Sequence, residues 1–200
     1  TLALVLTDIA NPFWTIVARG VEDIAQANGY SIILCNTDES ETKQEQYLNM
    51  LLRRRIDGIV LVPAQSAPGP IARIQKHNIP VVVLDRRIPG LEVDIVRADS
   101  ENGAFLLTEH LLSLGHRRIA MLAGPATVST AVDRVKGYRR ALAAAGLPAE
   151  SAIITWGTFT VDSGREMALQ AIGANPQLTA FFAANNFIAI GALQALREVG

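Results

Sequence analysis

Short apolar runs alternate with longer segments of helical periodicity along the whole chain. Most of the runs read as continuous apolar stretches, which is typical of parallel strands buried on both faces. We expect strands at Leu2–Leu6, Ser31–Asn36, Gly58–Val62, Val81–Leu84, Val93–Ala98, Arg118–Leu122, Ala152–Thr155 and Thr179–Ala183. Helical patterns between them predict an α/β fold of parallel sheets flanked by helices.

The first predicted helix has residues that mark both of its ends. Asn11 can cap it, Pro12 suits its first position, and Asn28-Gly29 can end it. The apolar positions at helical spacing are Phe13, Val17, Val21 and Ile24. Phe13 lies on this stripe and is expected to pack in the core, whereas Trp14 lies off it and is the better candidate for stacking on a ligand.

The alternation of strands and helices begins again after Ala98, which predicts two lobes, residues 1–98 and residues 99–200. In an open α/β sheet, ligands bind beyond the carboxyl ends of the strands, where a loop connects each strand to the N-terminus of the next helix. The loops at these ends are therefore where a functional site is expected.

Those loops combine aromatic rings, carboxylates, amides and guanidinium groups. The candidate ligand-binding residues are Phe13, Trp14, Asp85, Arg86, Arg134, Phe159 and Asn185. Rings pack against the C–H faces of a sugar-like ligand while acids and amides exchange hydrogen bonds with its hydroxyls. Each has a simpler alternative: Asp85-Arg86 as a solvated surface pair, Arg134 as a surface helix residue, and Asn185 as a helix cap.

Charge and cysteine content narrow the class of protein. Eighteen basic and nineteen acidic residues nearly cancel, and the basic triplet Arg53–Arg55 closes a predicted helix, where cations complement the helix dipole. No apolar run reaches the roughly 20 residues that span a bilayer, and the opening Leu2–Leu6 does not resemble an export signal. Cys35, the single cysteine, is expected to be a buried residue in a reducing compartment.

Enzyme signatures are missing from the chain. It contains no G-x-G-x-x-G after the first strand, no G-x-x-x-x-G-K-[ST] and no G-x-S-x-G. His77, His110 and His116 lie away from the predicted loop edge and have no partner at metal-ligand spacing. We therefore expect a non-catalytic receptor without metal or cofactor.

Several segments carry a family resemblance. Leu2 to Trp14, with its NPFW ending, His110 to Ala120 with LGHRRIA, Arg134 to Tyr138, and Ala184 to Gly191 resemble the effector-binding core of LacI/GalR-type bacterial transcription regulators. The resemblance implies a periplasmic-binding-protein-like type I fold that closes on a small-molecule effector. The two aromatic residues together with Asp85-Arg86 favour a monosaccharide or a similar polyol, whereas purine effectors also occur on the scaffold of this family. The resemblance also implies a cytoplasmic homodimer whose N-terminal helix-turn-helix headpiece, which precedes Thr1 and is not in the chain, binds operator DNA.

The resemblance assigns roles to individual positions. Phe13 and Trp14 match aromatic effector contacts, Asp85-Arg86 matches a sugar-binding acid–arginine pair, and Arg134 matches an arginine that grips effector hydroxyls or carboxylate. Phe159 lies near an aromatic contact of the family, and Asn185 matches a polar contact of the last loop.

The chain also departs from the family. Asn186 stands where the family usually has Asp, and the family fold continues beyond Gly200, so the second lobe is expected to be incomplete. Two rival functions share the chemistry: a periplasmic sugar-binding protein of a transport system, and an α/β enzyme acting on a sugar or nucleotide.

Overall fold

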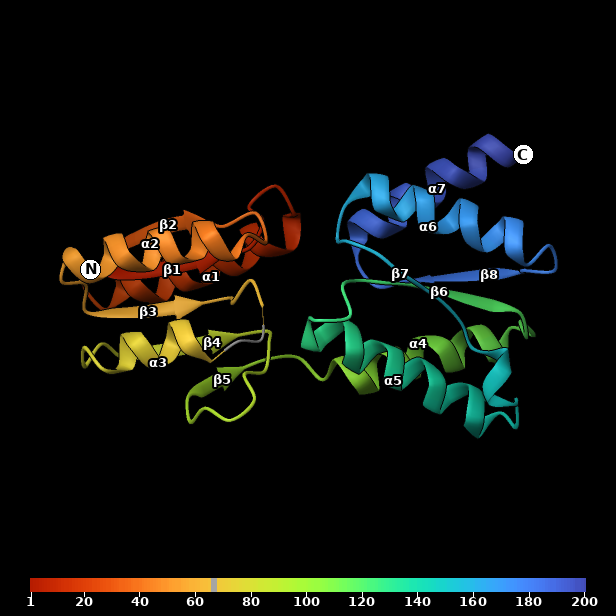
Figure 1. The fold of residues 1–200 in the computed structure, drawn as a ribbon, viewed down its shortest axis with the longest axis horizontal. Helices are drawn as coiled ribbons and strands as arrows, with labels where there is room; N and C mark the ends of the chain where they lie inside the picture. The colour runs from red at the N-terminus through yellow and green to blue at the C-terminus, as the bar shows by residue number, and fades with distance from the viewer. Residues whose placement is uncertain (66–67) are drawn as a thin grey trace. The chain divides into compact units, whose positions relative to one another are not determined.

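Two compact units make up the computed structural model, Thr1–Ala98 and Asp99–Gly200. The structure describes residues 1–65 and 68–200. Each unit contains one parallel sheet with helices on both faces (Figure 1). The predicted fold class, parallel sheets flanked by helices, is confirmed.

The first unit holds a five-stranded sheet in the order β2-β1-β3-β4-β5. Its elements are β1 (Leu2–Leu6), α1 (Pro12–Ala27), β2 (Ile32–Asn36), α2 (Glu41–Arg53), β3 (Gly58–Leu61), α3 (Gly69–Gln75), β4 (Val81–Leu84) and β5 (Asp94–Val96). Every pair of neighbouring strands is parallel. All carboxyl ends therefore lie along one edge, and the loops that follow the strands are gathered there. Helix α3 is not among the elements predicted from the sequence.

Alternate residues of β1 enter two separate cores. Ala3 and Val5 pack with apolar residues of α2 and α3, whereas Leu4 and Leu6 pack on the α1 side. This strand is buried on both faces, as its apolar run predicts. Strand β5 differs from β1, because its three residues are all exposed and it is an edge strand that pairs on one side with β4 alone.

Helix α1 begins and ends where the sequence predicts. Asn11 is its N-cap, with Oδ1 accepting from the Phe13 amide at 3.0 Å, Pro12 is its first residue, and Asn28 is its C-cap. Its orientation differs from the prediction. Trp14 is buried, with 7% of its surface exposed, while Phe13 is 52% exposed. The apolar surface of α1 is wider than the stripe read from the sequence, and the sheet covers the side that carries Trp14.

The second unit holds a three-stranded parallel sheet in the order β7-β6-β8. Its elements are α4 (Ser100–Ser113), β6 (Ile119–Ala123), α5 (Ser129–Ala144), a 3-10 turn (Ala149–Ser151), β7 (Ile153–Trp156), α6 (Val161–Ala174), β8 (Ala180–Ala183) and α7 (Asn186–Val199). Helices α4 and α5 lie on one face, and α6 and α7 on the other (Figure 1).

Tyr138 of α5 joins this helix to two strands of the second sheet. Its hydroxyl donates to the Ile119 carbonyl at 2.8 Å and accepts from the Ile153 amide at 3.2 Å. The side chain is fully buried. Both of its hydrogen bonds therefore satisfy backbone groups at the starts of β6 and β7.

Candidate functional site

The seven candidate residues all follow the carboxyl end of a strand. In the first unit, Phe13 and Trp14 open α1 after β1, and Asp85 and Arg86 directly follow β4. In the second unit, Arg134 lies on α5 after β6, Phe159 in the loop after β7, and Asn185 after β8. Because the strands of each sheet are parallel, each set is gathered at one edge of its own unit.

The two aromatic residues after β1 pack against each other edge to face. Their ring centroids lie 4.8 Å apart with an interplanar angle of 70°. Trp14 is buried by the sheet and Phe13 is half exposed, so Phe13 has more free surface than Trp14. The prediction that Phe13 packs in the core is wrong, and Trp14, the preferred candidate for stacking on a ligand, is the buried ring of the two.

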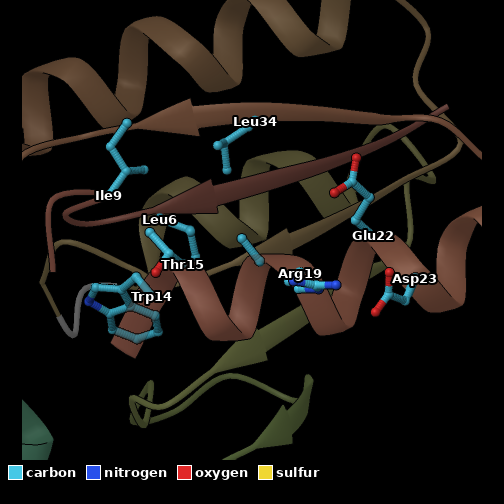
Figure 2. A pocket seen from close by; sticks show the side chains of 9 residues that line it. Leu6, Ile9, Trp14, Thr15, Arg19, Glu22, Asp23 and Leu34 are labelled. Atoms are coloured by element: carbon cyan, nitrogen blue, oxygen red, sulfur yellow. The ribbon is translucent and has the colours of Figure 1, made fainter. Parts of the chain in front are cut away.

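A surface groove runs beside α1, with a cavity volume of about 420 Å³. Figure 2 shows apolar side chains, Leu6, Ile9 and Leu34, on the sheet side, and Arg19, Glu22 and Asp23 along the helix. Trp14, Thr15 and Ala18 complete the lining. Of the seven candidate residues, Trp14 alone lines the groove.

The two residues of the acid–arginine pair after β4, Asp85 and Arg86, have different environments. Asp85 adopts φ +66°, in the left-handed region, and its amide donates to the Val96 carbonyl at 2.8 Å. The Arg86 side chain is 2% exposed. The alternative of a solvated surface pair is therefore wrong for Arg86.

The partner of Arg86 is Glu39, which lies 47 residues earlier in the chain. Arg86 Nη2 donates to Glu39 Oε1 at 2.6 Å, and Nη1 donates to Oε2 at 2.8 Å. Nη1 also donates to the Pro63 and Ala64 carbonyls, at 2.6 and 2.8 Å. Glu39 is not among the residues predicted from the sequence, although an acid in the loop after β2 was a signal for it.

Other side chains fix the loops beside this pair. The Ala64 amide donates to Gln44 Oε1 at 2.7 Å, and Gln44 is buried. The Ile9 amide donates to Asn36 Oδ1 at 3.1 Å, and Asn36 Nδ2 donates to Asp38 Oδ1 at 2.6 Å. Asp38 also pairs with Lys43, whose ammonium lowers the pKa of the Asp38 carboxyl. Polar side chains therefore hold the loops after β1, β2 and β3.

Candidate residues of the second unit also have structural contacts. Arg134 is partly buried on α5, one residue after the buried Asp133. The Phe159 ring lies against Gly124, where an added Cβ would come within 2.1 Å of the ring. Asn185 Oδ1 accepts from the Ile188 amide at 2.8 Å and caps α7. The capping alternative for Asn185 is therefore correct as far as this oxygen is concerned.

Across residues 1–65 and 68–200, no three His, Cys, Asp or Glu side chains lie together in a group that could hold a metal ion. Among the helices that the structure describes, none combines the length and apolar character that crossing a bilayer requires.

Comparison with known proteins places the chain in a family. All of residues 1–200 match the model of the periplasmic binding proteins and sugar-binding domain of the LacI family. The chain belongs to this family. The regulator DegA of Bacillus subtilis is 33% identical over the whole chain, which spans 60% of the length of DegA. The family resemblance read from the sequence is confirmed.

Solved structures of this family agree with the fold. A LacI-family regulator from Enterococcus faecium with bound ribose is 31% identical, has a TM-score of 0.88, and is covered over 73% of its length by the whole chain. The solute-binding protein of an ABC transporter from Burkholderia multivorans is 25% identical, has a TM-score of 0.89, and is covered over 75%. The chain corresponds to the effector-binding domain of LacI-family regulators.

Proposed function

We propose that this domain binds a sugar or a related small polar molecule and, in the whole regulator, controls operator binding by an N-terminal helix-turn-helix headpiece. The observation that carries the proposal is that aromatic and polar side chains follow the strands at the carboxyl edge of each sheet, in a domain of this family: Phe13 and Asp85 in the first unit, and Arg134, Phe159 and Asn185 in the second. Carboxyl edges of parallel sheets are where α/β folds bind ligands. The ribose bound to the Enterococcus faecium regulator supports a sugar as the effector.

The proposed contacts come from both units. Phe13 offers a half-exposed ring, with Trp14 packed behind it, and Asp85 supplies carboxylate acceptors. In the second unit the proposed contacts are Arg134, Phe159 and Asn185. Arg86, which the sequence analysis included, directs its Nη1 and Nη2 atoms at Glu39 and two carbonyls, so we propose no direct contact for it.

The proposed mechanism is a shift of populations. An effector held by residues of both units favours a closed arrangement over an open one, and the attached headpieces gain or lose operator affinity as a result. The effector shifts this balance only by the difference between its affinities for the two arrangements. No chemical step is needed, and the regulators among the relatives act on transcription.

A homodimer is part of the proposal, and α1 offers a surface for it. Ile16 and Ile24 of α1 are 73% and 69% exposed, and Gly20 lies midway between them with open space around it. An antiparallel crossing of two copies at Gly20 would bring Ile16 of one copy against Ile24 of the other. Arg19 would then approach the acids that follow it on the partner's α1 helix, which gives charge complementarity.

We propose a cytoplasmic location, because a transcription regulator acts on DNA. The rival function is that of a periplasmic sugar-binding protein, which the similarity to the Burkholderia multivorans solute-binding protein favours. An upstream helix-turn-helix in the gene would exclude the rival, and an export signal there would support it.

The test is calorimetric titration of the full-length protein with a panel of pentoses, hexoses and nucleosides. We expect saturable binding of one compound, and we expect Asp85→Ala and Arg134→Ala to abolish it without unfolding the protein. Arg139→Ala is the matched control, because Arg139 is an exposed arginine on the same helix.

The outcomes separate the alternatives. Binding that survives both substitutions would show that the effector site lies elsewhere. Turnover of the bound compound that stops with Asp85→Ala would favour the enzyme, and binding without turnover would argue against it.

A further inference from the structure

Three loops at the carboxyl edge of the first sheet meet at one buried guanidinium. Arg86 follows β4, Glu39 follows β2, and Pro63 and Ala64 follow β3. The four hydrogen bonds from Arg86 to these residues measure 2.6 to 2.8 Å. A planar guanidinium matches a carboxylate bidentately, so these contacts fix the orientation of Arg86 as well as its position.

The burial of the two partners is unequal. Arg86 is 2% exposed, while the Glu39 side chain is 33% exposed. A buried arginine cannot shed its charge at ordinary pH, so it depends on its acidic partner. Glu39, reached by solvent, can be hydrated without Arg86. Loss of the Glu39 carboxylate is therefore expected to disturb Arg86 and the loops that it contacts, whereas loss of Arg86 would leave Glu39 hydrated by solvent.

The backbone around this pair is held in conformations that non-glycine residues rarely adopt. Asp38, Glu39 and Asp85 have φ values of +51°, +57° and +66°. Left-handed residues persist where the surrounding contacts over-determine them, and they are found preferentially at functional sites. Here Asp85, the residue before Arg86, is also the acid proposed to meet the effector.

We infer that Glu39 is a positioning residue: its carboxylate holds Arg86, and through Arg86 it sets the conformation of the loop after β2, of Pro63 and Ala64, and of Asp85. The consequence for effector affinity rests on the proposed function. The fixing of the loops does not, so it is tested without any effector.

The test is amide hydrogen exchange in Glu39→Gln. Two reporters lie in the loops: the Glu39 amide, bonded to the Thr7 carbonyl, and the Ala64 amide, bonded to Gln44. We expect both to exchange about tenfold faster or more, as the loss of hydrogen bonds to a charged group predicts. The Ile59 amide, bonded to the Pro80 carbonyl, reports on the sheet and should keep its rate.

The matched control is Glu45→Gln. Glu45 pairs with Arg73 at 2.8 Å, but these side chains are 58% and 35% exposed. Removing this surface pair should leave all three reporter amides unchanged.

A double-mutant cycle shows whether Glu39 acts through Arg86. Arg86→Met removes the buried charge, and Glu39→Gln in that background should then add no further change in exchange. If Glu39→Gln alone fails to fold, a folded Glu39→Gln/Arg86→Met protein supports the inference and an unfolded one overturns it.

Three other results would overturn the inference. They are wild-type exchange in Glu39→Gln, equal acceleration of the Ile59 amide, and an equal effect of Glu39→Gln with and without Arg86. A failed sugar titration would count against the proposed function alone.

Discussion

One buried polar side chain, Tyr138, joins α5 to two strands of the second unit. The Tyr138 hydroxyl is both donor and acceptor for backbone groups of two strands, and burial raises the pKa of Tyr138 to about 12. The hydroxyl therefore contributes through its hydrogen bonds while it is protonated, and its ionisation opposes folding.

Tyr138→Phe is expected to lower the free energy of unfolding by about 1–3 kcal/mol near neutral pH, because two backbone groups lose their partner. The raised pKa means that the folded state holds the phenol proton more tightly than the unfolded state. The wild-type advantage should therefore be complete below pH 10 and fall by about 2–3 kcal/mol as pH rises to about 12. Urea denaturation of both proteins across this range measures it.

The control for this prediction is Tyr30→Phe. Tyr30 is an exposed tyrosine, so its substitution should change stability by less than about 0.5 kcal/mol. A wild-type advantage over Tyr138→Phe that stays constant through pH 12 would contradict the assigned pKa.

At the scale of elements, glycine sets how closely helices approach. Gly191 of α7 faces α6, and an added Cβ would lie 2.0 Å from the Val161 carbonyl oxygen. Gly164 of α6 is equally restricted, because a Cβ there would lie 2.5 Å from the Ile188 carbonyl oxygen. The α6–α7 pair therefore packs backbone against backbone at this crossing.

We expect Gly191→Ala to destabilise the protein by about 1–3 kcal/mol, because the two helices must separate to admit the methyl group. Gly103→Ala is the control. Gly103 lies in α4 with open space around it, so alanine should stabilise that helix by about 0.5–1 kcal/mol. Chemical denaturation measures both, and equal effects would show that the crossing is not tightly packed.

Strands and helix ends were largely predictable because their signals are local. All eight expected strands are present, and the ends of α1 agree with its capping residues. Burial was less predictable, because it depends on position in the sheet. The strand predicted at Val93–Ala98 carries Asp94 and Arg97 within its apolar run, and β5 is an exposed edge.

At the scale of the whole molecule, the α1 surface bears on assembly. Ile16, Gly20 and Ile24 form one exposed line on this helix, continuous with its buried apolar side. An exposed apolar line beside opposite charges is the surface that the proposed homodimer would bury.

Ile16→Glu is therefore expected to shift the proposed dimer to monomer, since an unpaired charge would be buried in each of the two Ile16–Ile24 contacts. Sedimentation velocity measures the change, and circular dichroism should show the same helix content. Gln26→Glu, which adds the same charge to an exposed position of α1 away from the line, should leave the dimer intact. A dimer that persists with Ile16→Glu would place the interface elsewhere.

The sequence by itself determined the fold class, the strands, the ends of α1 and the chemical types that follow each strand. These depend on side-chain periodicity and on neighbours within a few residues. Tertiary structure alone decided that Trp14 is buried and Phe13 exposed, because the apolar surface of α1 is wide and only the sheet selects its covered side. It alone paired Glu39 with Arg86, because the strand order β2-β1-β3-β4 brings together loops that are distant in the chain.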